Sequence, residues 1–189
     1  GQNNYAALTE FWQGQDNTAL AAIYAWQEAL QDSSKEALIK AGDMLSDAYA
    51  GMGPEESQDL MFFFVKKAEE AYRAALASDP DDYDLKVKLA SNIAEAQGNV
   101  MEGVQLLREV VDENPHHVEA NLILGRFSIT SGQYDKAVER LETVVQNDPS
   151  NLEAWVLLGD VYQVLGENEK SKEAFRMAAE NAPSEELRT

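Results

Sequence analysis

Two stretches decide the fold: LILGRFSITSGQYDKAVERLETVVQNDP, residues 122–149, and LLGDVYQVLGENEKSKEAFRMAAENAP, residues 157–183. Each contains a Leu-Gly pair, a later glycine and a closing proline, and matching positions lie 34 residues apart. The same spacing relates Pro115 to Pro149 and Pro149 to Pro183. A period in this range is typical of proteins built from stacked helix pairs. Such stacks present extended binding surfaces, so the period also indicates how the protein works.

The final repeat shows the pattern of one helix pair. Its first helix has an inward face at positions i, i+3, i+4 and i+7, which are occupied by Trp155, Leu158, Gly159 and Tyr162. Gly166 predicts the end of this helix, and Pro183 predicts the end of a second helix that turns Ser171, Phe175 and Ala178 inward. A glycine inside a helix costs about 1 kcal/mol relative to alanine. We therefore expect the partner helix to approach Gly159 too closely for a Cβ atom.

The period holds from residue 84 onward and breaks upstream, where two further units are expected. The spacing from Gly42 to Ala68 is 26 residues, 14 more than the 12 that separate Gly125 from Ala137. The excess predicts an extended second unit with a long second helix over residues 55–78. The expected units are 1–33, a degenerate N-terminal repeat; 34–83, the extended repeat; 84–117; 118–151; and 152–189, a repeat with a short tail.

The two quoted stretches closely resemble the tetratricopeptide repeat family. The resemblance implies an all-α fold, a right-handed superhelix of antiparallel helix pairs. It also implies a non-catalytic scaffold that binds a peptide or helix of another protein in a concave groove built from the first helix of each pair. Together with the missing initial methionine, it favours the periplasm-facing soluble domain of a bacterial envelope protein, with the cytoplasm as the alternative.

Carried over residue by residue, the family pattern gives the groove-facing side chains. They are Asp43, Asp47, Lys88, Asn92, Glu95, Leu122, Arg126, Ile129, Val156, Asp160 and Gln163. Charged and apolar side chains together suit an extended peptide or a helix, whereas the alternative is that these are ordinary solvated helix faces. Lys88 and Asn92 match part of the carboxylate clamp of chaperone-tail binders. The rest of that clamp is replaced by Ile123, Glu153 and Leu157, so we reject it, while another carboxylate could still be held by Lys88 and Arg126.

Six consecutive apolar residues, Leu60 to Val65, fall within the expected long helix. They cover every side of a helix, so one packing interface cannot bury them all. One interpretation is that the stretch packs in the N-terminal core. The other is a patch for association between copies or with a partner, formed by Phe62, Phe63 and Phe64.

Composition excludes several functions. The net charge of −19 disfavours binding to nucleic acid and to anionic lipid surfaces. Cysteine is absent from the sequence, and no apolar run approaches the roughly 20 residues that span a bilayer. His116 and His117, the only histidines, suit a polar turn better than a metal site.

No P-loop, His-Glu-x-x-His, Gly-x-Ser-x-Gly or Gly-x-Gly-x-x-Gly motif occurs in the sequence. We therefore expect no enzyme activity, no cofactor and no metal. The expected partner is a protein or peptide. The alternatives are a structural protein that associates only with copies of itself and a regulatory subunit of an enzyme complex.

Overall fold

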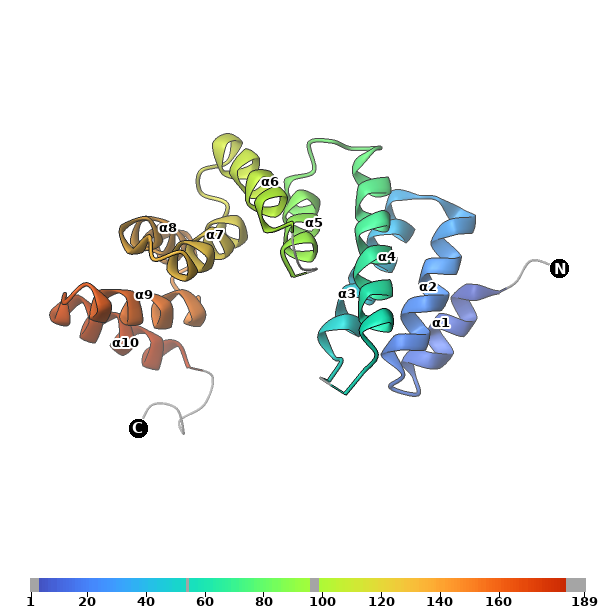
Figure 1. The fold of residues 1–189 in the computed structure, drawn as a ribbon, viewed down its shortest axis with the longest axis horizontal. Helices are drawn as coiled ribbons and strands as arrows, with labels where there is room; N and C mark the ends of the chain where they lie inside the picture. Colours follow the sequence, from blue (N-terminus) through green and yellow to red (C-terminus); the bar gives the residue numbers. More distant parts are fainter. Residues whose placement is uncertain (1–3, 54, 96–98, 183–189) are drawn as a thin grey trace. The chain divides into compact units, whose positions relative to one another are not determined.

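The computed structural model describes residues 4–53, 55–95 and 99–182, and within them all regular structure is α-helical (Figure 1). The chain divides into two compact units, Gly1–Leu106 and Leu107–Thr189, with the division inside α6. The helices are α1 (Tyr5–Gln13), α2 (Thr18–Asp32), α3 (Lys35–Ala50), α4 (Gln58–Leu76), α5 (Tyr83–Glu95), α6 (Val100–Glu113), α7 (Val118–Thr130), α8 (Tyr134–Asn147), α9 (Leu152–Val164) and α10 (Asn168–Asn181). The all-α fold expected from the sequence is confirmed.

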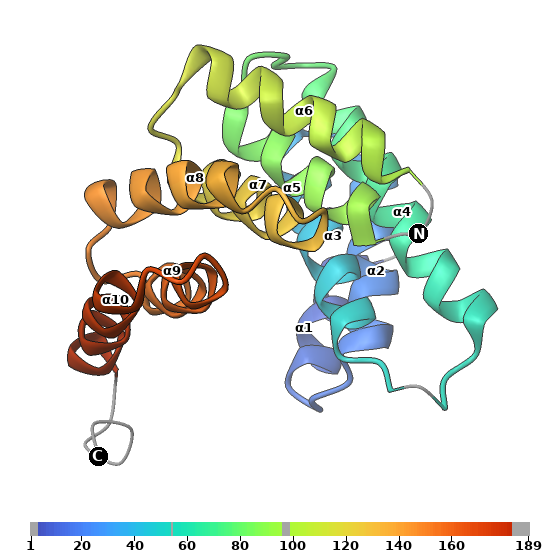
Figure 2. The ribbon, with the colours of Figure 1, turned by 60° about the vertical axis from the view of Figure 1, so that its left-hand side comes forward.

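Helices that follow one another in the chain pack side by side within each unit. In unit 1 each helix from α1 to α4 contacts the helix that follows it, and in unit 2 the same holds for each helix from α7 to α9. Figures 1 and 2 show α9 and α10 as one such pair, running along each other in opposite directions. The core of unit 1 includes Trp26, Leu45 and Phe64, and that of unit 2 includes Leu141 and Leu158.

Side chains and glycines set the helix ends. The side chain of Asn151 accepts a 3.0 Å hydrogen bond from the backbone N–H of Ala154 at the start of α9, which satisfies a donor that the helix leaves free. Gly132 and Gly166 follow α7 and α9 with φ of 72° and 78°. Glycine adopts this left-handed conformation without the steric penalty of a Cβ atom, which explains why glycine recurs at this position of the period.

Gly159 leaves space for an aromatic ring. A Cβ atom built on Gly159 would lie 2.6 to 2.7 Å from three ring carbons of Phe175, on the partner helix α10. The expectation that no Cβ fits is confirmed, and the obstacle is a side chain rather than the helix backbone. Phe175 covers Gly159 but is itself 38% exposed, so it is not turned fully inward as expected, whereas Leu141, 34 positions earlier, is fully buried.

The long helix α4 has 19 residues and lies within the expected range 55–78. Its apolar stretch is divided between core and surface. Phe64 and Val65 are 0% and 2% exposed, while Phe62 and Phe63 are 58% and 37% exposed. Phe64 is therefore a core residue, which corrects its assignment to an association patch, because only a side chain with free surface can contact another molecule.

Candidate functional site

In unit 1, α3 and α5 are the first helices of two successive pairs, and their shared outer side is called the first-helix face of the unit. The cation on this face, Lys88, is paired with a carboxylate. The Nζ atom of Lys88 donates to both carboxylate oxygens of Asp43, at 2.7 and 2.6 Å. Asp43 also accepts a 2.9 Å hydrogen bond from the hydroxyl of Tyr72, on α4. Burial, together with the nearby Asp43 carboxylate, raises the pKa of Tyr72 and keeps it a hydrogen-bond donor. Asp47 lies on α3, as Asp43 does, and is exposed.

Asn92 lies beneath this face and not on it. Its side chain is 4% exposed, and its Nδ2 donates a long 3.4 Å hydrogen bond to Oγ of Ser46. Within the described residues its buried Oδ1 has no hydrogen-bond partner. A buried acceptor left unpaired costs about 1–3 kcal/mol. A groove role for Asn92 thus requires its side chain to turn outward. The side chain of Glu95 lies outside the described residues.

In unit 2 the first-helix face is formed by α7 and α9. Nη1 of Arg126 lies 3.3 Å from Oε1 of Glu153, and both side chains are 48% exposed. Val156 is 38% exposed, and Asp160 and Gln163 are exposed beside it on α9. An ion pair, an apolar side chain and polar groups are thus all presented to solvent on two adjacent helices.

Two expected groove residues on α7 are less accessible. Leu122 is 4% exposed and belongs to the core cluster of unit 2, and Ile129 is half-buried against the same cluster. Leu122 is thereby corrected from a groove residue to a core residue. Its counterpart on α9, Val156, keeps free surface because α9 and α10 form the last described pair.

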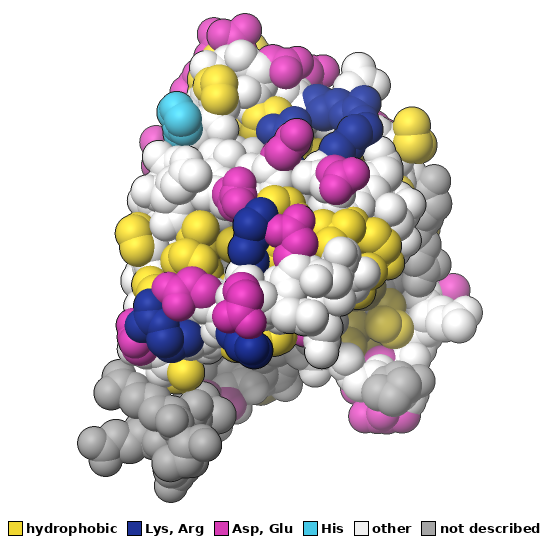
Figure 3. Space-filling model, turned by 90° about the vertical axis from the view of Figure 1, so that its left-hand side faces the viewer, with side chains coloured by type: hydrophobic (Ala, Val, Ile, Leu, Met, Phe, Trp, Pro, Cys, Tyr) yellow, Lys and Arg dark blue, Asp and Glu magenta, His cyan; other side chains and the backbone are white. Residues whose placement is uncertain are grey.

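Each of the two expected carboxylate-binding cations faces a carboxylate of its own chain: Lys88 faces Asp43 and Arg126 faces Glu153. Charges of both signs also lie next to one another, with apolar side chains between them, on the side of the molecule drawn in Figure 3. An incoming carboxylate would have to compete with these internal partners. The first-helix faces are therefore better suited to a segment with mixed side chains than to a lone anion.

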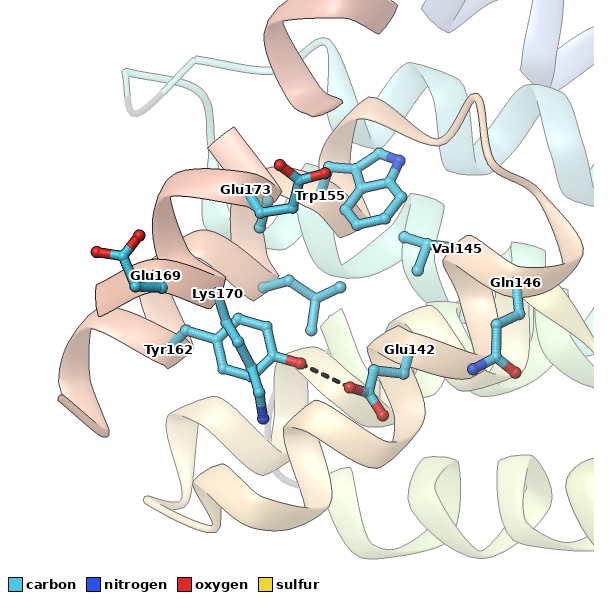
Figure 4. Close-up of a pocket in the computed structure, with 10 residues that line it drawn as sticks. Glu142, Val145, Gln146, Trp155, Tyr162, Glu169, Lys170 and Glu173 are labelled. Atoms are coloured by element: carbon cyan, nitrogen blue, oxygen red, sulfur yellow. Dashed lines mark hydrogen bonds between the residues drawn. The ribbon is translucent and has the colours of Figure 1, made fainter. Parts of the chain in front are cut away.

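A cavity of about 550 Å³ lies within unit 2, between α8, α9 and α10 (Figure 4). Trp155, Leu158 and Tyr162 of α9 line it, on a different face of that helix from Val156 and Asp160. The sequence pattern identified these three residues only as inward-facing. A signal that could have found the cavity is Ala174, which stands where the preceding repeat has a large side chain.

The two histidines contact different groups: the side chain of His116 lies 3.5 Å from the amide of Asn147, and that of His117 caps a helix. Nδ1 of His117 accepts a 3.3 Å hydrogen bond from the backbone N–H of Ala120 at the start of α7. In the described part of the chain, no group of three or more His, Asp and Glu side chains is arranged to hold a metal ion. No described helix has both the length and the apolar character needed to cross a bilayer.

These helix pairs and their exposed first-helix faces define an all-α repeat protein that acts as a protein–protein interaction scaffold. The model of the tetratricopeptide repeat family matches residues 94–148 and 128–189, together just over half of the sequence. The chain therefore belongs to the tetratricopeptide repeat family. A search of curated proteins finds no match.

Solved structures share the fold. A crystal structure of MamA is 18% identical with a TM-score of 0.69, covering 92% of this chain and 94% of its own. MamA from Desulfovibrio magneticus RS-1, residues 41 to the end, is 16% identical with a TM-score of 0.68, covering 94% of this chain and 92% of its own. YrrB, described as a TPR protein with an unusual peptide-binding site, is 19% identical with a TM-score of 0.61, covering 99% of this chain and 89% of its own.

Proposed function

We propose that this protein is a non-catalytic scaffold that holds an extended or helical segment of a partner protein on its first-helix faces. The observation that carries the proposal is the exposed face of α9. Val156 and Val164 are 38% and 61% exposed there, eight residues apart, with Asp160 between them. Apolar side chains at this spacing anchor a peptide or helix, and the polar neighbours fix the position along the face at which it binds.

The corresponding face of unit 1 offers a different chemistry. Asp43, Asp47 and Lys88 are its charged groups, and beneath it the buried oxygen of Asn92 has no hydrogen-bond partner among the residues that the structure describes. A backbone N–H of a bound segment would supply the missing donor if Asn92 turned outward. We propose that this face contributes polar contacts to a partner, and that the α7–α9 face contributes apolar ones.

Two further considerations support a binding role without catalysis. Members of this family act mostly as scaffolds, and the sequence contains none of the catalytic motifs considered above. YrrB, which shares the fold, is described as having a peptide-binding site. Because sites and not folds carry function, the likeness raises the expectation of peptide binding but does not identify the peptide.

Site-specific photo-cross-linking tests the proposal. The photoreactive residue p-benzoylphenylalanine is placed at Val156, Gln163 or Asp47, all on first helices, and at Lys136 on the second helix α8 as the control. After irradiation in a lysate of the source organism, we expect the same partner to be attached at positions 156 and 163 and not at 136. Equal labelling at all four positions, or adducts only at 136, would rule out the first-helix faces.

A second candidate function is association between copies through the start of α4. Leu60, Phe62 and Phe63 are 37%, 58% and 37% exposed, and the ammonium group of Lys66 lies 5.7 Å from the centre of the Phe62 ring. Adjacent exposed aromatic side chains are typical of interaction patches. Light scattering over a range of protein concentrations tests this function. A mass that rises with concentration in the wild type and stays monomeric in Phe62→Ser supports it, and a monomeric wild type refutes it.

A further inference from the structure

The cavity between α8, α9 and α10 has aromatic walls that are fixed at their polar edges. The indole Nε1–H of Trp155 donates a 2.9 Å hydrogen bond to the backbone carbonyl of Pro149. The hydroxyl of Tyr162 donates a 2.6 Å hydrogen bond to Oε1 of Glu142 (Figure 4). The polar edge of each ring is thus occupied, and the apolar remainder of both rings lines the cavity.

Acidic side chains predominate at the rim. The charged groups that line the cavity are those of Glu142, Glu169, Lys170 and Glu173. Glu173 pairs with Arg176, and Glu169 pairs with Lys172. Within the described part of the chain, Glu142 forms no ion pair; the ammonium group of Lys170 interacts with it electrostatically but is paired with Glu167. The carboxylate of Glu142 is therefore available to a cation that enters the cavity.

The preceding repeat shows how the equivalent space is filled there. The residues 34 positions before Trp155 and Ala174 are Asn121 and Arg140. Nη1 of Arg140 donates a 3.0 Å hydrogen bond to Oδ1 of the buried Asn121, so the side chain of α8 reaches across to α7. In the last repeat, Ala174 occupies the position of this arginine, and Trp155 occupies the position of the asparagine that accepts its hydrogen bond.

The charge of the site changes with this exchange. The residue 34 positions before Glu142 is Arg108. One period earlier the chain thus carries arginines at both positions: Arg108 on α6 corresponds to Glu142 on α8, and Arg140 on α8 corresponds to Ala174 on α10. The alanine at position 174 lacks the guanidinium group of Arg140, which opens space. The carboxylate of Glu142 replaces the guanidinium group of Arg108, which reverses the sign of the charge beside that space.

Lys170 shows that a cation is accommodated against this aromatic wall. Its Nζ lies 5.1 Å from the centre of the Tyr162 ring and 2.5 Å from Oε2 of Glu167. The distance to the ring is within the range of a cation–π interaction. Because the Lys170 side chain is 60% exposed, it can move into solvent when another cation enters.

We propose that this cavity binds an arginine side chain supplied by a basic segment of a partner protein. A planar guanidinium group stacks on aromatic rings and pairs with a carboxylate, and here Trp155, Tyr162 and Glu142 provide both. The volume of about 550 Å³ falls within the range of ligand pockets, which leaves space for residues next to the arginine. The net charge of −19 attracts basic segments. The site is separate from the first-helix faces and goes beyond the function proposed for them.

Nuclear magnetic resonance titration tests the site directly. The probe is a dodecapeptide with three Gly-Leu-Arg-Ser repeats, and its control is the same peptide with citrulline, which keeps the shape of arginine without its charge. The indole N–H resonance of Trp155, identified by its loss in Trp155→Phe, reports binding. We expect a saturable shift with the arginine peptide and a weaker response with the citrulline peptide.

Variants separate the cavity from general electrostatic attraction. Glu142→Gln is expected to weaken binding about threefold to fivefold, as for a partly exposed cation contact. Its matched control, Glu139→Gln, makes the same charge change on α8 away from the cavity and should leave binding unchanged. Ala174→Arg should weaken binding further because it restores the guanidinium of the preceding repeat. Lys170→Gln should strengthen binding because it removes the competing ammonium group.

Several results would overturn the proposal. These are equal binding of the arginine and citrulline peptides, equal effects of Glu142→Gln and Glu139→Gln, and no shift at Trp155. Free arginine amide that binds as tightly as the peptide would make the ligand a small molecule and not a protein segment. Circular dichroism melts establish which variants fold, and Glu142→Gln carries the test if Ala174→Arg does not. Cross-linking at Val156 tests the first-helix faces independently.

Discussion

The ammonium group of Lys88 on α5 lies 2.6 Å from Oδ2 of Asp43 on α3, a residue 45 positions earlier in the chain. The pair joins the first helices of two successive helix pairs within unit 1. Tyr72 donates to the same carboxylate from α4, so Asp43 is the acceptor at which three helices meet. A residue that appears in the sequence as a free cation is therefore part of the internal structure of the unit.

The first prediction concerns this pair. Because both side chains are more than a third exposed, Lys88→Gln should lower the free energy of unfolding by less than about 1 kcal/mol. The loss should become smaller in 1 M salt, which screens exposed charges. Urea unfolding followed by circular dichroism measures both values. Lys40→Gln, which breaks the exposed pair with Glu28, is the matched control. A loss above about 2 kcal/mol would show that Lys88 is effectively buried.

The second prediction orders two glycine substitutions. A Cβ atom at Gly42 would lie 2.5 Å from the ring of Tyr72, and one at Gly159 would lie 2.6 Å from that of Phe175. Tyr72 is 3% exposed and hydrogen-bonded, whereas Phe175 is 38% exposed and can move outward. Gly42→Ala should therefore destabilise by about 1–3 kcal/mol, and Gly159→Ala by less, since overpacking is costly where neighbours cannot move.

Thermal and urea unfolding of both variants check this order. Phe175→Leu, which shortens the obstructing side chain, should reduce the cost of Gly159→Ala in the double variant. If either alanine raised stability by about 1 kcal/mol, as it does in an open helix, the ring contacts would be refuted.

The third prediction separates neighbouring phenylalanines. Phe64→Ala should cost about 3–5 kcal/mol because it leaves a cavity in the core of unit 1. Phe62→Ala, in contrast, should change the free energy of unfolding by less than about 1 kcal/mol because more than half of its ring is exposed. Urea unfolding of the two variants at one protein concentration measures the difference. Similar losses in the free energy of unfolding for both variants would contradict the exposure of Phe62 at the start of α4.

The fourth prediction concerns acid stability. Partial burial pushes the pKa of Asp82 upward, but hydrogen bonds from Lys35 Nζ and from the backbone N–H of Leu85 outweigh it, so the pKa lies below 3.8. The unfolded state therefore binds the proton more readily. The ionised side chain stabilises the fold above about pH 5, and this contribution disappears as the pH falls through the lowered pKa.

Asp82→Asn keeps a side chain able to cap α5 but removes the charge. Its free energy of unfolding should lie below that of the wild type at pH 7, by up to about 1 kcal/mol, and the difference should close toward pH 3. Urea unfolding at pH 7, 5, 4 and 3 measures it, with the exposed Asp81→Asn as the control. A difference that stays constant with pH would show that the charge of Asp82 is not responsible.

The repeat architecture was predictable because its signals are local. The spacing of Leu158, Gly159 and Tyr162 marks a helix face, and Gly166 marks the helix end, within ten residues of chain. The 34-residue period then repeats these signals, and the family match and the solved structures agree with the all-α fold. In α4 the same reasoning predicted that six consecutive apolar residues could not all be buried, but it did not predict that Phe64 is buried while Phe62 is exposed.

What the sequence determined by itself is therefore the class of the protein: helix pairs that recur every 34 residues in the second half of the chain, strongly acidic and without a cysteine. The tertiary structure decided which groups are free to bind. It pairs Lys88 with Asp43, buries Asn92 and Leu122, and opens a cavity beside Trp155. The physical reason is distance along the chain. Helix formation depends on neighbours three and four residues away, whereas burial, ion pairing and cavities depend on side chains that meet only after helices far apart in sequence have packed.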